Sequence, residues 1–342
     1  MKISVITPHY YPALRGNAVT VRRIEKYLAN MGFQVVVLAL DARTSQEIGR
    51  ISAEERPDLI HAFHGWTGGR VARAISEQTG IPYIITLTGT DVYEALEDAR
   101  KAETHEALRE AGALVVFHDS VKKRLTAHFP SLAEKTFVIP QGVELPEGDC
   151  SGIGGFPFSA GKLTFLLPAG LRPVKNVLFP LEPLARLFEQ EPRGRFVIAG
   201  PIIDADYAAE VMARLEHFPF AHYIGGISHD AIGCLYKKAD VILNTSLSEG
   251  GMANSVVEGM AFGKPVLASA IEANRWLIKD GVTGFLYHDA TDFREKAAQL
   301  ADDEELRKRL GEHARGYVLE NFPPEREAAA YAELYKMVRS EE

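Results

Sequence analysis

The stretch S-E-G-G-M-A-N-S-V-V-E-G-M-A-F-G-K-P-V-L-A-S runs from Ser248 to Ser269 and predicts a turn, a helix and a strand. The apolar run Val241–Leu243 before it is typical of a buried strand, and the glycine pair at 250–251 favours a tight turn. A helix is then expected from about Asn254 to Phe262, because the glycine and proline that follow would end it. A second strand begins at Val266.

Two carboxylates, Glu249 and Glu258, flank the glycine turn and the start of this helix. The free N–H groups and the positive dipole end of a helix N-terminus suit a phosphate or a cluster of hydroxyl groups. We therefore expect a ligand site here. The expected contact residues between the two carboxylates are Gly250, Gly251, Met252, Ala253, Asn254 and Ser255.

Length and composition limit the possible classes of protein. The chain has 342 residues and a net charge of -8, which fits two globular domains and lacks the basic footprint of a nucleic-acid-binding protein. No signal peptide is apparent, and the longest apolar run, Val35–Leu40, is too short to span a bilayer. We expect a cytoplasmic protein. The basic clusters Lys122–Arg124 and Arg22–Arg23 either contact anionic lipid weakly or are solvated helix faces.

Short apolar runs alternate with longer stretches of helical spacing, as in parallel sheets that helices cover on both faces. The alternation stops in the Gly-, Pro- and Ser-rich segment Pro146–Lys162, an expected linker, and then resumes. Two doubly wound, Rossmann-like α/β domains are therefore predicted, with ligands at the C-terminal strand ends in the cleft between them. The predicted strands are Ile3–Thr7, Val35–Leu40, Leu59–Ala62, Tyr83–Leu87, Leu114–Phe117, Phe137–Ile139, Leu163–Leu167, Phe196–Ala199, His222–Ile224, Val241–Leu243, Val266–Ala268 and Phe285–Tyr287, and the last helices are Leu306–Leu319 and Glu325–Val338.

Loops that follow the first strands hold candidate binding residues. Gly16, with Asn17 after it, either lets the backbone approach a ligand at the start of a helix or makes an ordinary turn. His64, near Trp66, is either an acid, a base or a hydroxyl-binding group in the loop, or a structural residue. For His61, inside the strand, the pattern favours a structural role.

Two further loops of the first half carry small or titratable side chains. Thr88 and Gly89 end a strand and suit the floor of a pocket, whereas Asp91 is expected to cap the next helix. His118 ends the fifth strand, and its role stays open between ligand contact and structure. The pair Asp119–Ser120 after it is typical of helix capping.

Cations follow the first strand of the second half. Gly170 permits a turn, and Arg172 and Lys175 then lie at the mouth of that strand. A diphosphate leaving group needs such neutralisation, because negative charge builds on it as its bond breaks.

No metal-ligand set, nucleophile elbow or Walker phosphate loop occurs in the sequence. We therefore expect no metal and no cofactor, and we expect the chemistry to depend on electrostatics and positioning. A glycine turn after the third strand of this half either holds a base or is only a turn, and comprises Gly225, Gly226 and Ile227.

Taken together, these residues resemble the retaining glycosyltransferases of family 4, the group 1 transferases of the GT-B fold. The resemblance covers nearly the whole chain, and the stretch with the two glutamates is its most specific part. The motifs G-N-A-V-T, L-T-G-T-D-V-Y, G-L-R-P-V-K and S-E-G-G-M-A-N are most similar to a small branch that holds the glycosyltransferase 1 domain-containing protein 1 type and the selenosugar synthases. Other matching motifs are D-L-I-H-A-F-H-G at Asp58–Gly65 and I-P-Q-G-V at Ile139–Val143.

The resemblance implies a metal-independent, retaining hexosyltransferase that moves a sugar from a nucleotide-diphosphate sugar to an unidentified acceptor. UDP is the expected nucleotide, and the acceptor is expected to be a small molecule or a glycan. Arg172 and Lys175 would hold the diphosphate, and Gly16 would let its loop close on it. Glu258 would accept both ribose hydroxyls, and Glu249 would contact the donor sugar. The alternatives are a nucleotide-sugar epimerase or hydrolase on the same scaffold, or a non-catalytic nucleotide-sugar-binding protein.

The family pattern also implies domain boundaries. Residues 1–148 with 323–342 would form the acceptor-side domain, to which the C-terminal helix crosses back, residues 149–162 the linker, and residues 163–322 the nucleotide-sugar domain. The expected acceptor-side contacts are His64, Thr88, Gly89 and His118. Three departures from the pattern occur: the two glutamates are nine rather than eight residues apart, Thr88 replaces a frequent histidine, and G-L-R replaces G-R-L.

Overall fold

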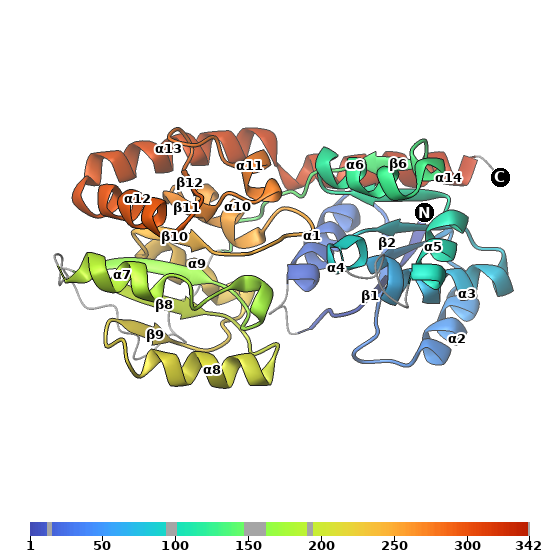
Figure 1. Cartoon of the computed structure of the whole chain (residues 1–342). Helices are drawn as coiled ribbons and strands as arrows, with labels where there is room; N and C mark the ends of the chain where they lie inside the picture. Colours follow the sequence, from blue (N-terminus) through green and yellow to red (C-terminus); the bar gives the residue numbers. More distant parts are fainter. Residues whose placement is uncertain (12–15, 94–100, 147–161, 190–193, 341–342) are drawn as a thin grey trace. The chain divides into compact units, whose positions relative to one another are not determined.

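A computed structural model of the chain describes residues 1–11, 16–93, 101–146, 162–189 and 194–340 (Figure 1). The chain divides into two compact units. The predicted linker, residues 149–162, lies outside the described residues except for its last residue, and the predicted domain boundaries on either side of it stay a prediction. Unit 1 comprises Met1–Gly142, Gly250–Met252 and Phe322–Glu342, and unit 2 comprises Val143–Glu249 and Ala253–Asn321.

Unit 1 is built on a parallel six-stranded sheet with the order β2-β1-β3-β4-β5-β6. Its strands are β1 (Lys2–Thr7), β2 (Gln34–Ala39), β3 (Leu59–Phe63), β4 (Tyr83–Thr86), β5 (Ala113–Val116) and β6 (Thr136–Val138). Its helices are α1 (Gly16–Asn30), α2 (Ser45–Glu55), the π-turn η1 (His64–Gly69), α3 (Arg70–Thr79), α4 (Thr90–Tyr93), α5 (Lys101–Glu110), α6 (Asp119–His128), the 3₁₀ turn η2 (Pro130–Leu132) and α14 (Pro324–Ser340).

Helices cover both faces of this sheet, because successive side chains of a strand point to opposite faces and both sets are apolar. In β3, Leu59 and Phe63 join one core with side chains of α1 and α14. Ile60 and Ala62 join the other core with side chains of α2, α3, α5 and α6. The C-terminal helix α14 therefore belongs to unit 1 and lies on the same face as α1 (Figure 1).

Unit 2 repeats the architecture with the order β12-β11-β10-β7-β8-β9, again parallel throughout. Its strands are β7 (Leu163–Pro168), β8 (Gly194–Ala199), β9 (Ala221–Tyr223), β10 (Val241–Asn244), β11 (Val266–Ser269) and β12 (Phe285–Tyr287). Its helices are the 3₁₀ turn η3 (Pro173–Lys175), α7 (Leu181–Phe188), α8 (Ala205–Leu215), α9 (His229–Lys238), α10 (Asn254–Ala261), α11 (Glu272–Leu277), α12 (Ala290–Asp302) and α13 (Glu304–Asn321).

The predicted α/β fold with two doubly wound parallel sheets is confirmed, and all twelve predicted strands are present with ends that differ by at most two residues. The predicted helix after the glycine turn is α10. It packs closely on β10 because Gly259 has no side chain: a Cβ there would lie 2.9 Å from Cγ1 of Ile242.

A buried ion pair ties α14 to α1. Arg23 donates from Nε to Oε2 of Glu327 at 2.7 Å and from Nη2 to Oε1 at 3.0 Å, and both side chains are almost fully buried. This bidentate geometry satisfies both charges in a site that excludes water. Neither alternative for Arg22–Arg23, weak lipid contact or a solvated helix face, therefore holds for Arg23, whose buried guanidinium pairs with Glu327.

A second polar group on α14, the hydroxyl of Tyr335, meets the sheet at His61. The two ring nitrogens of His61 lie 2.7 Å from the hydroxyl of Tyr335 and 2.7 Å from that of Thr86, and Tyr331 reaches the same threonine at 3.0 Å. Burial lowers the pKa of His61 to about 3, so the ring is neutral at physiological pH. These contacts give His61 a structural role.

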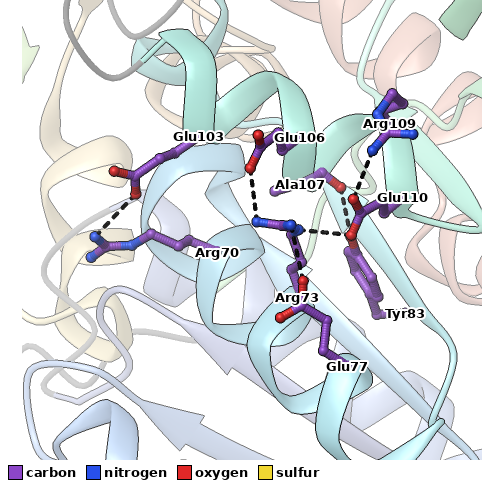
Figure 2. A network of polar contacts seen from close by, with 9 residues as sticks. All are labelled: Arg70, Arg73, Glu77, Tyr83, Glu103, Glu106, Ala107, Arg109 and Glu110. Carbon is purple, nitrogen blue, oxygen red and sulfur yellow. Dashed lines mark hydrogen bonds and ion pairs between the residues drawn. The ribbon is translucent and has the colours of Figure 1, made fainter.

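Charged side chains of α3 and α5 form a network at the surface of unit 1 (Figure 2). Arg73 contacts Glu77 at 2.9 Å, Glu106 at 2.9 Å and Glu110 at 2.7 Å, and about a quarter of its side chain is exposed. Arg70 reaches Glu103 at 3.5 Å.

Because water screens this network, we expect Arg73→Gln to lower the free energy of unfolding by less than about 1 kcal/mol. Urea denaturation of the variant beside Arg70→Gln, which removes a single longer contact, measures the effect. A loss above about 2 kcal/mol would contradict the assignment of this network to the solvated surface.

Candidate active site

The order of strands in unit 2 reverses between β7 and β10, and ligands bind at such a switch point beyond the carboxyl ends of the strands. The loop after β7 leads into η3, which holds Lys175, and the loop after β10 holds Glu249. Two hydrogen bonds join these loops: Thr245 Oγ1 donates to the carbonyl of Lys175 at 2.7 Å, and Leu247 N donates to Val174 O at 2.9 Å. The two loops are therefore one structural unit at the expected position.

An ion pair between Lys175 and Glu249 lies at the centre of these loops. Lys175 Nζ donates to Glu249 Oε1, which also accepts from Ser246 Oγ at 2.6 Å. Burial raises the pKa of Glu249, but the charge and hydrogen bond of Lys175, the Ser246 hydroxyl and the charge of Arg172 outweigh it and hold the pKa below its ordinary value. Glu249 is therefore a carboxylate, and Lys175, Arg172 and Glu249 form one electrostatic cluster. The predicted diphosphate role of the two cations stays a prediction.

Two asparagines that the sequence analysis did not select extend this cluster. Asn274 of α11 donates from Nδ2 to Asn244 Oδ1 at 3.0 Å and to Ser269 O at 2.9 Å. Because Oδ1 of Asn244 accepts from Asn274, the Nδ2 group of Asn244 faces Glu249 and lies 3.5 Å from its Oε1. Asn274 is buried and distant in sequence, so no local pattern could have indicated it.

The second glutamate, Glu258 of α10, is held by two side chains of α9. His229 Nε2 lies 2.9 Å from Oε1, and Tyr236 donates its hydroxyl to Oε2 at 2.8 Å. Glu258 is 6% exposed and Tyr236 fully buried. Burial, together with the charge and hydrogen bond of Glu258, raises the pKa of Tyr236 well above its ordinary value, so the hydroxyl stays a donor. The sequence analysis missed both partners, because no local pattern links α9 to Glu258.

The remaining predicted residues of unit 2 lie at loops and helix starts. Gly170 follows β7, and Gly225, at φ +81°, accepts a hydrogen bond from Gly200 N at 2.8 Å in the loop after β9. Ala253 caps α10 through its backbone, since its carbonyl accepts from two amides of the first turn. The other predicted contacts are Gly226 and Ile227 in the loop before α9, Asn254 and Ser255 in the first turn of α10, and Gly250, Gly251 and Met252, which group with unit 1.

In unit 1, His64 has an unusual backbone conformation. It begins the π-turn η1 at φ +72°, a region that costs energy for a residue with a side chain and that clusters at functional sites. Its Nδ1 accepts from Thr67 N at 3.2 Å. His64 follows β3, which neighbours β1 where the strand order of this sheet reverses. This position fits the predicted loop contact with a ligand, and that role stays a prediction.

The sequence suggested that Asp91 caps the next helix, and this prediction is wrong. Asp91 instead organises the loop after β4. Its buried carboxylate accepts from the backbone amides of Thr88 at 3.0 Å, Gly89 at 2.6 Å and Gly65 at 2.8 Å, and so joins two loops. Asn17, at the start of α1, lies 3.5 Å from the Thr88 hydroxyl, and Gly16 precedes it. The structure thus brings Asn17, Thr88 and Gly89 together.

The expected capping by Asp119 and Ser120 is also wrong. The N-cap residue of α6 is His118, without a side-chain cap, and the Ser120 hydroxyl contacts His118 Nδ1. His118 is fully buried.

Within the described residues, no three His, Cys, Asp or Glu side chains gather as metal ligands, and no helix is both long and apolar enough to cross a membrane.

This chain has two units, each built on a doubly wound parallel sheet with its candidate residues at the carboxyl ends of the strands. This architecture is that of the GT-B class of proteins. Solved structures of this class match the whole chain: sucrose-phosphate synthase of Thermosynechococcus elongatus has a TM-score of 0.83 at 19% identity, covering 100% of both chains. HepE of Anabaena in complex with UDP-glucose has a TM-score of 0.81 at 17% identity, covering 98% of this chain and 100% of the other.

The sequence matches two family models, the glycosyl transferase 4-like domain over residues 3–142 and the glycosyl transferases group 1 over residues 156–317. Among curated proteins, glycosyltransferase 1 domain-containing protein 1 of Xenopus tropicalis is 28% identical over 327 residues, 93% of each chain. The chain therefore carries a glycosyl transferase 4-like domain followed by a glycosyl transferases group 1 domain.

Proposed function

We propose that this chain is a retaining hexosyltransferase that moves a sugar from a nucleoside-diphosphate sugar to an acceptor, with UDP as the nucleotide and without a resident metal ion. One observation carries the proposal: Lys175, Arg172 and Glu249 form an electrostatic cluster at the carboxyl ends of β7 and β10. The match to HepE, whose structure was solved with UDP-glucose, supports the choice of UDP.

In the proposed step, the bond between the anomeric carbon of the sugar and the β-phosphate oxygen breaks. The acceptor oxygen bonds to the same face of that carbon, and its proton passes to the departing phosphate oxygen. Negative charge therefore builds on the diphosphate, where Arg172 and Lys175 neutralise it. Such a step needs no nucleophile from the chain.

The ion pair leaves Lys175 able to serve the diphosphate. An ammonium group has three N–H donors, and one of them points to Glu249, so two remain for phosphate oxygens. The side-chain hydrogen bonds that Glu249 accepts in the described part of the chain reach Oε1, and Oε2 would accept from a hydroxyl of the donor sugar. Glu249 thus holds the cation and contacts the sugar with different oxygens.

Other candidate residues complete the proposed binding. In unit 2, the turn at Gly170, the loop at Gly225–Ile227 and the first turn of α10 line the nucleotide. In unit 1, Gly16 and Asn17 contact the diphosphate, and the acceptor is bound at the carboxyl edge of the sheet. The acceptor-side residues are His64, Thr88, Gly89 and His118.

Thermal-shift measurements with UDP-, GDP- and ADP-sugars test the donor, since a ligand that binds the native state raises the melting temperature. We expect a UDP-sugar to give the largest rise. Incubation of that donor without an acceptor should leave its sugar unchanged. Release of free sugar would identify a hydrolase, a changed sugar an epimerase, and tight binding without transfer to a broad acceptor panel a binding protein, each of which contradicts the proposal.

The ribose role of Glu258 gives a prediction for binding. Glu258→Ala should weaken UDP affinity about 10- to 100-fold, because hydrogen bonds to a charged group are among the stronger ones. Isothermal titration calorimetry measures it, with Glu312→Ala, an exposed glutamate of α13, as the matched control. Unchanged UDP affinity in a folded Glu258→Ala variant would refute the ribose assignment.

A further inference from the structure

Glu258 receives its two hydrogen bonds from one helix face. His229 begins α9 and Tyr236 follows seven residues later, about two turns along, so both side chains project on the same side. They reach different oxygens of the carboxylate, His229 at Oε1 and Tyr236 at Oε2. The carboxylate of α10 is thereby fixed in both position and rotation.

Tyr236, which bonds Oε2 of Glu258, is itself held rigidly in place. The ring of Tyr236 stacks on Phe262, with centroids 5.2 Å apart and planes 15° from parallel, and none of the residue is exposed. A hydroxyl opposite a carboxylate must donate, because an ionised carboxylate only accepts. Tyr236 therefore sets the direction of Oε2.

The arrangement leaves capacity for a ligand. A carboxylate offers about four acceptor positions on its two oxygens, and His229 and Tyr236 use one on each. One position remains on each oxygen, which matches two adjacent hydroxyl groups that both donate. A vicinal diol is the ligand chemistry that this geometry fits.

We propose that Tyr236 and His229 are positioning residues that orient Glu258 toward the 2′,3′-diol of a nucleoside diphosphate and so determine the preference for ribose over deoxyribose. The inference rests on the proposed function, which supplies the nucleotide. Both residues contact the carboxylate of Glu258, so we expect their effect to fall on nucleotide binding and to leave the chemical step unchanged.

Tyr236→Phe tests this role, because it removes one oxygen atom and keeps the ring stacked on Phe262. Calorimetry with UDP and with 2′-deoxy-UDP gives the ratio of the two dissociation constants. We expect a ratio of about 10 or more in the unmodified protein and below about 3 in the variant, with UDP affinity about 5- to 20-fold weaker. The KM for the donor should rise accordingly, while kcat at saturating donor changes less than about twofold.

Two controls separate positioning from a structural role. Tyr83→Phe in unit 1 also loses a buried tyrosine hydrogen bond, 2.8 Å to Ala107 O, and should leave the ratio unchanged. His229→Gln keeps a donor for Oε1 and should retain most of the discrimination, whereas His229→Leu should lose it. If Tyr236→Phe fails to fold, the comparison of His229→Gln with His229→Leu tests the proposal instead.

The outcomes are distinct. An unchanged ratio in Tyr236→Phe and in His229→Leu, or a uniform loss of affinity for both nucleotides with a lower melting temperature, overturns the positioning role and leaves the proposed function intact. Failure of the unmodified protein to bind UDP, GDP or ADP overturns the proposed function and this inference with it. A collapsed ratio at constant kcat supports both.

Discussion

Lys175→Ala should lower kcat about 100- to 1000-fold, the range that follows removal of a donor aimed at developing transition-state charge. The leaving diphosphate gains its charge only as the glycosidic bond breaks, so most of the contribution of Lys175 falls on the chemical step. Affinity for the nucleoside part should change far less. Steady-state kinetics with saturating donor and calorimetry with uridine measure the two effects separately.

The ion pair with Glu249 complicates this variant, because loss of the cation leaves a largely buried carboxylate without its counter-charge. Melting temperatures must therefore accompany the kinetics. Glu249→Gln, which keeps Lys175 and a hydrogen-bonding side chain, shows the cost of the lost pair, and Lys279→Ala removes an exposed lysine of unit 2 as the charge control. A fall in kcat of less than about tenfold for folded Lys175→Ala would contradict the leaving-group role.

The fold could be predicted from the sequence because its signals are local. Runs such as Val35–Leu40 and Val266–Ala268 are apolar on both faces, as strands of a parallel sheet buried between helices must be. The strand ends then place Arg172, Lys175 and Glu249 at one edge of the sheet, because parallel strands share a direction. For these three residues, the strand order alone was enough to predict that they lie close together.

The partners of the site could not be predicted because they are set by tertiary packing. His229 and Tyr236 come from a helix that only the folded chain brings to Glu258, and Asn274 comes from one that it brings to Asn244 beside Glu249. Asp91 shows the same limit: its position suggested a helix cap, yet burial between two loops makes it accept from three backbone amides. A short polar motif indicates that a side chain will be hydrogen-bonded, but not to which segment.

Arg23 is the clearest case, since the pair Arg22–Arg23 suggested a basic surface and the fold buries its second member. We expect Arg23→Met to lower the free energy of unfolding of unit 1 by about 3–5 kcal/mol, because it leaves the buried carboxylate of Glu327 unpaired. The loss should far exceed that of Arg73→Gln at the surface.

The double variant Arg23→Met/Glu327→Leu decides whether charge or packing is responsible. Removing both charges avoids the unpaired carboxylate, so it should recover most of the stability lost in the single variant. Trp66 belongs to unit 1 and Trp276 to unit 2, so urea denaturation in a Trp276→Phe background follows unit 1 through the fluorescence of Trp66. If the double variant is as unstable as Arg23→Met, the arginine acts through its packing between α1 and α14, and the ion pair itself contributes little.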